Sequence, residues 1–273
     1  MAKLKIGIVG CGAIGSSLAT YITRNLKLSA ELSGLYDLDN LKSESLAKKI
    51  GRKKVASKSL KSLVCASNLV IESASAESSF SIASVALKAR KDILIMSVGG
   101  IAHKIHLLRK IAYRNNCKVY LPSGALSGVD ALKASNISRV RSVTLVTTKN
   151  PLSFKGVKYI EDRKIKLLNL KKKRILFCGR ALDAVKYFPQ NINVAAILSL
   201  SGLGLRKTRV KIIASPKVKK NIHEVWVRSD AGNFYTRTEN IPHPDNPKTS
   251  YLAVLSAIAV LKGILEPVSS GTN

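Results

Sequence analysis

The sequence predicts an α/β chain: an N-terminal parallel sheet followed by a second, α+β domain. Three observations support this class. An apolar, β-branched run ends in a glycine-rich turn within the first fifteen residues, and a helical pattern follows the turn. Apolar strand patterns then alternate with helical patterns as far as Leu121, as in βαβ units. Beyond Ala125 alternating apolar and polar residues dominate, with Gly-containing turns typical of antiparallel strands.

The glycine-rich turn follows the strand Lys5–Val9 and spells G-x-G-x-x-G from Gly10 to Gly15. The first glycine allows a tight turn, the second leaves room for a pyrophosphate, and the third lets helix and strand pack closely. The helix over 16–25 points its free N–H groups and positive dipole end at the phosphates. A ligand-free turn is the alternative, which the full strand–turn–helix context disfavours. We predict a Rossmann domain whose dinucleotide contacts Gly10, Cys11, Gly12, Ala13, Ile14 and Gly15.

An acidic residue, Asp37, ends the second predicted strand (31–36), 22 positions after Gly15. A carboxylate there accepts hydrogen bonds from the adenosine ribose and disfavours a 2′-phosphate. This favours NAD, while neighbouring Lys42 and the high positive charge leave NADP possible.

The rest of the first domain, to residue 122, continues the βαβ pattern. Ligands of such sheets bind at the carboxyl ends of the strands. The strand over 69–74 therefore brings Ser73 and Ala74 to the cofactor edge, together with Gly99-Gly100 and residues 123–125. The other predicted strands are 54–56, 93–97 and 118–121, and the predicted helices are 43–50, 59–65, 77–88 and 103–115.

The second domain is predicted over 123–245, and its basic segment at 155–174 is expected to be exposed and either irregular or edge structure. A proline-rich loop at 242–247 then leads to an apolar helix over 249–264, capped by Thr249. We expect residues 246–266 to return to the first domain and 267–273 to fray. The other predicted helices are 128–135, 180–187 and 193–200, and the strands are 140–148, 175–177, 210–214, 222–228 and 234–239.

Composition restricts the class of protein. A length of 273 residues with 46% hydrophobic residues suits two ordinary domains. The four cysteines form no C-x-x-C pair, so neither a zinc site nor a disulfide framework is predicted, and a reducing, cytoplasmic setting is expected. No signal sequence opens the chain and no apolar run has the length of a membrane span, so a soluble protein is expected.

The net charge of +30 would attract nucleic acid, acidic membranes or small anions. However, the basic residues are scattered along amphipathic segments. The densest stretch, 155–174, has nine basic and two acidic residues without interleaved aromatics, and it matches no nucleic-acid module. A basic solvated surface is therefore favoured over a polyanion site.

A histidine stands out on the strand over 222–228, where alternate side chains share a face. His223 lies on the same side as Val225 and Val227, which is apolar. It is either a core histidine or a proton-transfer group, since imidazole titrates near neutrality. His103, His106 and His243 are interpreted as structural.

Two helix starts offer groups for a carboxylate or carboxamide. Asn191 and Asn193 precede or begin one predicted helix, and Lys248 and Thr249 precede the last one. Ordinary helix capping explains both patterns equally well.

Several motifs occur in a telling order: the glycine turn, Pro122-Ser123-Gly124-Ala125, Lys149-Asn150-Pro151, the run from Phe188 to Ala196, Asn221-Ile222-His223-Glu224, and the run from Asn246 to Tyr251. Together they resemble the L-aspartate dehydrogenase family over nearly the whole chain, and Ser73–Ala76 fits its strand end. The basic segment is least family-like.

This resemblance implies a Rossmann domain, a catalytic α+β domain and a homodimer. It also implies NAD(P)-dependent oxidation of L-aspartate to iminoaspartate, which hydrolyses to oxaloacetate and ammonia or supplies NAD biosynthesis. The family's catalytic histidine corresponds to His223, and cofactor contacts correspond to Ala125 and Asn193. Asn191, Lys248 and Thr249 are candidates for binding the substrate.

The sequence leaves two alternative functions open. One is another Rossmann oxidoreductase, of the dihydrodipicolinate reductase or homoserine dehydrogenase type. The other is a non-catalytic, NAD-sensing protein that binds polyanions.

Overall fold

The computed structural model describes residues 2–167, 170–188 and 192–268. The described chain forms two compact units. The first comprises residues up to 122 and the segment from 254 onward, and the second comprises residues 123–253.

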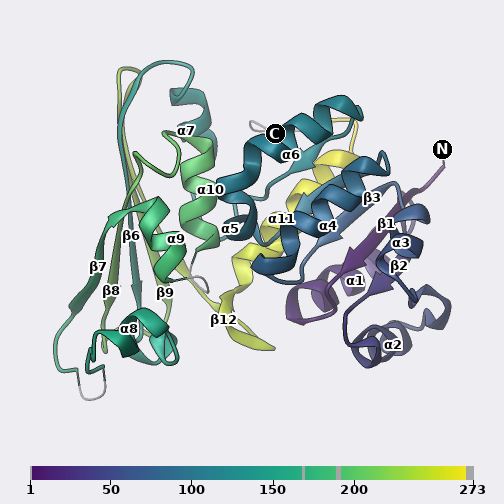
Figure 1. The fold of residues 1–273 in the computed structure, drawn as a ribbon, viewed down its shortest axis with the longest axis horizontal. Helices are drawn as coiled ribbons and strands as arrows, with labels where there is room; N and C mark the ends of the chain where they lie inside the picture. Colours follow the sequence, from purple (N-terminus) through teal and green to yellow (C-terminus); the bar gives the residue numbers. More distant parts are fainter. Residues whose placement is uncertain (1, 168–169, 189–191, 269–273) are drawn as a thin grey trace. The chain divides into compact units, whose positions relative to one another are not determined.

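The first unit contains a five-stranded parallel sheet, as the sequence predicts (Figure 1). Its order is β2-β1-β3-β4-β5, and each neighbouring pair runs parallel. The chain leaves β1 in one direction, to β2, and leaves β3 in the opposite direction, to β4, so the switch point lies between β1 and β3. Ligands bind at this point in doubly wound sheets. The strands are β1 Leu4–Val9, β2 Ala30–Tyr36, β3 Leu69–Glu72, β4 Asp92–Ile95 and β5 Val119–Tyr120.

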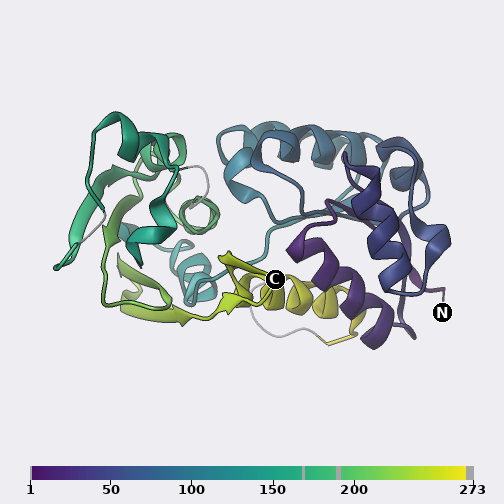
Figure 2. The same cartoon turned by 90° about the horizontal axis from the view of Figure 1, so that it is seen from below.

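Helices cover both faces of this sheet (Figure 2). One core cluster joins the sheet to α1 Ala13–Asn25, α2 Asn40–Lys49 and the later part of α11 Tyr251–Leu265. The opposite cluster joins it to α3 Leu60–Cys65, α4 Ala76–Lys88 and α6 Ile105–Arg114. Strand residues alternate between the two clusters, because successive side chains of a strand point to opposite faces. The chain therefore returns to this unit through the apolar face of α11.

Two local predictions in the first unit are wrong. The short strand expected at 54–56 is a 3₁₀ helix, Lys53–Val55, and only Ala56 forms a bridge, to Leu35. The strand expected over 93–97 ends at Ile95, and the residues after Ser97 form the short helix α5 Val98–Ile101. A Cβ at Gly100 would lie 1.9 Å from the Ala76 carbonyl oxygen, so the glycine allows α5 to pack on the start of α4. A 3₁₀ turn, Ala102–Lys104, leads from α5 into α6.

The second unit contains a five-stranded mixed sheet of order β10-β9-β6-β8-β7. All neighbours are antiparallel except β6 and β8, which run parallel, so the antiparallel prediction needs that correction. Helices α7 Val129–Ser135, α9 Ala181–Tyr187 and α10 Asn193–Ser201 lie on one side of the sheet (Figure 1). The strands are β6 Val140–Lys149, β7 Arg174–Arg180, β8 Arg209–Ala214, β9 Asn221–Ser229 and β10 Gly232–Asn240.

The basic segment is more ordered than its composition suggests. A 3₁₀ turn, Pro151–Phe154, and α8 Lys158–Asp162 bury Phe154 and Ile160. The Arg163 guanidinium lies 3.9 Å from the centre of the Tyr159 ring, which contacts Phe188. Phe154, just before this segment, and Tyr159 and Ile160 within it anchor the chain here, so the expectation of an exposed, irregular stretch is wrong for residues 158–162.

The expected proline loop is a small hairpin in which β11 Pro242–His243 pairs with β12 Asn246–Ser250. Thr249 therefore lies in a strand, and α11 begins only at Tyr251, so Thr249 does not cap that helix. Within the described ranges, no helix has the length and apolar character that crossing a bilayer requires.

Candidate functional site

The glycine turn has three different environments at its three glycines. Gly10 has φ of +94°, and a Cβ there would lie 2.5 Å from the Ser73 carbonyl oxygen. A Cβ at Gly15 would lie 1.9 Å from the Gly10 carbonyl oxygen. At Gly12, by contrast, a Cβ would meet nothing within 4 Å. The turn is closed on its protein side and open at Gly12, beside the start of α1, where a pyrophosphate group fits.

Asp37 connects this turn to the end of β2. Its Oδ2 accepts a hydrogen bond from the Cys11 N–H at 2.8 Å, and its Oδ1 accepts one from the Asp39 N–H at 3.0 Å. Each carboxylate oxygen keeps a lone pair for a ribose hydroxyl. Lys42 pairs with Asp39 at 3.8 Å. Burial and the Asp37 charge raise the pKa of Cys11 to about 12, so this residue is a neutral thiol in the turn.

The strand β3 ends in groups that fix the edge of the sheet. The Ser73 hydroxyl donates to the Gly10 carbonyl oxygen at 2.9 Å. The buried Glu72 carboxylate accepts from the Ala74 N–H and from both the N–H and the hydroxyl of Ser97, each at 2.9 Å. Burial raises the pKa of Glu72. The Ser73 hydroxyl and the Ala74 N–H thus hold the carboxyl edge of the sheet in place. Glu72, which sequence reasoning missed, connects the ends of β3 and β4.

His223 lies on the covered face of the second sheet, as predicted. It is 2% exposed, and Val225 and Val227 are buried with it. Thr147 is its partner across the β6–β9 pair, and the Thr147 Oγ1 lies 3.0 Å from the His223 Nδ1. Burial, and secondarily the charge of Lys149, lower the pKa of His223 to about 3. The imidazole is therefore neutral in this structure.

Lys149 ends β6 on the same face as Thr147, two residues further along the strand. It is 7% exposed, and burial lowers its pKa to about 8. The structure thus places a buried ammonium close enough to influence the imidazole. Sequence reasoning did not select this residue as a site residue. The alternation along β6 could have identified it, because Lys149 falls on the same buried side of the strand as Val143 and Leu145.

The other predicted site residues of the second unit have mixed positions. Ala125 is buried, and its carbonyl oxygen accepts from the Asn240 Nδ2 at 3.1 Å. Asn193 is the first residue of α10 and not its cap, since the cap position is Ile192. Thr249 is half-buried in β12. Asn191 and the Lys248 side chain lie outside the described residues.

The remaining histidines are separate from this arrangement. His103 and His106 are exposed. His243 is buried and accepts a hydrogen bond from the Asp245 N–H at 3.1 Å. Among the residues described, no group of histidine, cysteine and acidic side chains is arranged to hold a metal ion.

Family models match both parts of the chain. Residues 10–122 match the NAD-binding domain of homoserine dehydrogenase, and residues 130–264 match the C-terminal domain of aspartate dehydrogenase. The fold and the glycine turn, taken with these matches, define a two-domain dehydrogenase that uses a nicotinamide dinucleotide.

Relatives define the family more closely. An L-aspartate dehydrogenase of Methanosarcina acetivorans is 45% identical over 98% of this chain and its own full length. The crystal structure of aspartate dehydrogenase from Thermotoga maritima superposes with a TM-score of 0.76, at 27% identity, over 99% of this chain and all of that one. A hyperthermophilic archaeal homoserine dehydrogenase shares only the fold, with a TM-score of 0.60 at 13% identity over 97% of this chain and 98% of that one. The chain belongs to the L-aspartate dehydrogenase family, and the resemblance noted in its motifs is confirmed.

Proposed function

We propose that this chain oxidises L-aspartate to iminoaspartate with NAD or NADP, and that the imine hydrolyses to oxaloacetate and ammonia. The observation that carries the proposal is the buried His223 on the N-x-H-E strand of a chain related to L-aspartate dehydrogenases over its full length. We further propose that the iminoaspartate supplies NAD biosynthesis.

The glycine turn is proposed to hold the cofactor. The open space at Gly12 and the start of α1 suit the pyrophosphate. The doubly anchored Asp37 suits the ribose hydroxyls, and its negative charge opposes a 2′-phosphate, which favours NAD. When bound, the nicotinamide accepts a hydride from the substrate Cα. Ala125 and Asn193 remain predicted cofactor contacts.

His223 is proposed as the base. In the tautomer that we propose, the Nδ1–H of His223 donates to the Thr147 Oγ1, 3.0 Å away, and the Nε2 lone pair is left for the substrate. The ammonium group of L-aspartate must lose one proton before hydride leaves the Cα, and the Nε2 accepts that proton. The two carboxylates of the substrate favour the protonated imidazole, and this attraction raises the pKa of His223 from about 3 on binding.

Lys149 is proposed to attract a substrate carboxylate. Its ammonium is buried near the imidazole, where a carboxylate gains more from a positive charge than it would in water. Asn191, Lys248 and Thr249 remain predicted substrate contacts. A positive group beside the base also keeps the imidazole neutral until the negative substrate arrives.

We also propose a cytoplasmic homodimer. Trp226 and Tyr235 lie opposite each other on β9 and β10, with ring centres 4.2 Å apart. They are 52% and 43% exposed, which is unusual for paired large aromatics and supports association through this sheet face. All four cysteines are free thiols, consistent with a reducing compartment.

A substrate panel tests the proposed activity. NADH and NADPH formation are measured with L-aspartate, L-glutamate, L-homoserine and D-aspartate. We expect L-aspartate to give the highest kcat/KM. Turnover of L-homoserine without turnover of L-aspartate would place the activity with the homoserine dehydrogenases, and cofactor binding without any turnover would support a sensing role.

A further inference from the structure

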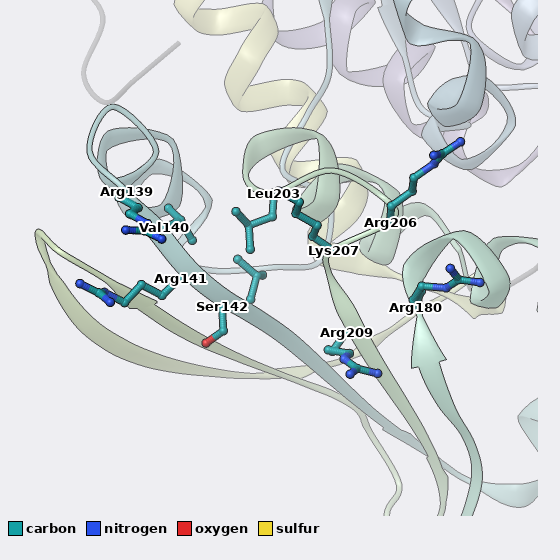
Figure 3. Close-up of a pocket in the computed structure, with 10 residues that line it drawn as sticks. Arg139, Val140, Arg141, Ser142, Arg180, Leu203, Arg206, Lys207 and Arg209 are labelled. Atoms are coloured by element: carbon teal, nitrogen blue, oxygen red, sulfur yellow. The ribbon is translucent and has the colours of Figure 1, made fainter.

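The second unit has a basic recess at one end of its sheet, where β6 and β8 begin and β7 ends (Figure 3). It encloses about 640 Å³. Six of its ten lining residues are Arg or Lys, against 46 of 273 in the chain. The recess therefore concentrates positive charge well beyond the general bias of the sequence. We call it the basic recess; its cations are Arg139, Arg141, Arg180, Arg206, Lys207 and Arg209.

The strand register places two of these charges side by side. Arg180 at the end of β7 pairs directly with Arg209 at the start of β8. Like charges directly opposite each other on neighbouring strands are destabilising. Figure 3 shows Arg139 and Arg141 on one side of the recess and Arg180, Arg206 and Arg209 on the other. An anion bound between the two sides would relieve this repulsion.

Acidic residues neutralise only part of the basic recess. Arg141 pairs with Asp230, and Arg180 pairs with Asp183 at 2.9 Å. No ion pair links the other four cations to an acidic residue of the described ranges. A ligand with several negative charges therefore matches the recess better than a single carboxylate.

The lining favours phosphate over nucleic acid. Guanidinium groups bind phosphate oxygens in a bidentate geometry. None of the ten lining residues is aromatic, so the recess lacks the stacking platforms that single-stranded nucleic acids use. Its volume falls in the range of small-molecule sites, about 300–1,000 Å³. We propose that the basic recess binds a small linear oligophosphate.

This site is distinct from that of His223. Thr147, the partner of His223, lies four residues along β6 from Val143, the nearest residue of that strand that lines the basic recess. At ~3.3 Å per residue this separation is about 13 Å.

Calorimetry with inorganic triphosphate tests the proposal on the full chain saturated with NADH, so that the glycine turn is filled. We expect triphosphate to bind, its affinity to fall with rising salt, and orthophosphate to bind at least about tenfold more weakly. The double variant Arg206→Gln with Arg209→Gln should weaken triphosphate binding by at least about tenfold, the effect of losing a charge-assisted hydrogen bond.

The matched control is Lys171→Gln with Lys172→Gln, which removes the same charge from exposed positions of the same unit. It should change triphosphate binding by less than about twofold, and both variants should retain L-aspartate oxidation. Equal weakening in both variants, no binding at about 1 mM triphosphate, or tighter binding of a single-stranded RNA would overturn the proposal. If the first variant does not melt cooperatively, Arg139→Gln with Lys207→Gln replaces it.

Discussion

Replacing Lys149 with Met should stabilise the fold while weakening the enzyme. Met has nearly the same length and carries no charge, so the substitution removes a buried ammonium without leaving a large cavity. Burial lowers the pKa of Lys149 from 10.5 to about 8. At ~1.36 kcal/mol per pKa unit, the charged form costs the folded state about 3 kcal/mol. This cost is present in full below the folded pKa, near 8, and disappears as pH rises towards 10.5.

Urea unfolding at pH 7 and pH 9.5 measures this cost. The variant should exceed the wild type by about 3 kcal/mol at pH 7, and the difference should shrink by more than half at pH 9.5, because wild-type Lys149 is then mostly neutral in the folded state. Lys155→Met, at an exposed position, is the control and should show no such pH-dependent difference. The KM for L-aspartate should rise at least about tenfold, the value of one charge-assisted contact. A variant less stable than the wild type at pH 7, or one with an unchanged KM, would refute the reasoning.

Three further substitutions test the glycine turn and the selection of the cofactor. Gly12→Ala should leave the urea midpoint unchanged yet weaken NADH binding at least about tenfold, because the new methyl enters space that only a ligand fills. Gly15→Ala should instead destabilise the fold by about 1–3 kcal/mol, since its methyl would meet the Gly10 carbonyl oxygen. Fluorescence titration with NADH and urea unfolding, applied to both variants, separate the two effects. Equal changes in NADH affinity and in urea midpoint for the two variants would contradict both predictions. Asp37→Ser should raise the ratio of kcat/KM for NADP to that for NAD by at least about tenfold, and an unchanged ratio would remove Asp37 from cofactor selection.

The first unit could be predicted well because its signals are local. A glycine turn, strand-end residues and helix periodicity are each contained within a few positions, and the parallel direction of the strands follows from the alternating βαβ pattern. The errors arose where tertiary contacts override local pattern. Gly99-Gly100 forms a helix because it packs on α4, and the proline-rich loop pairs as β11 and β12.

The sequence predicted the position of His223 on its strand but not its surroundings. Alternation on β9 placed His223 on the buried face, but its partner Thr147 lies 76 residues away and becomes visible only through the β6–β9 register. The lowered pKa of His223 also depends on burial and on Lys149, neither of which the strand pattern contains. Likewise, the sequence showed scattered basic residues, and the basic recess becomes visible only through the pairing of β8 with both β6 and β7.

The central claim is that His223 accepts the substrate proton while a nicotinamide accepts the hydride. The most direct measurement compares His223→Ala with the wild type in two assays: L-aspartate-dependent NADH formation and NADH binding in the absence of substrate. We expect kcat to fall by about 10²–10⁴-fold, the contribution of a positioned acid–base group, with NADH affinity nearly unchanged. A variant that retains wild-type kcat with L-aspartate would contradict the claim.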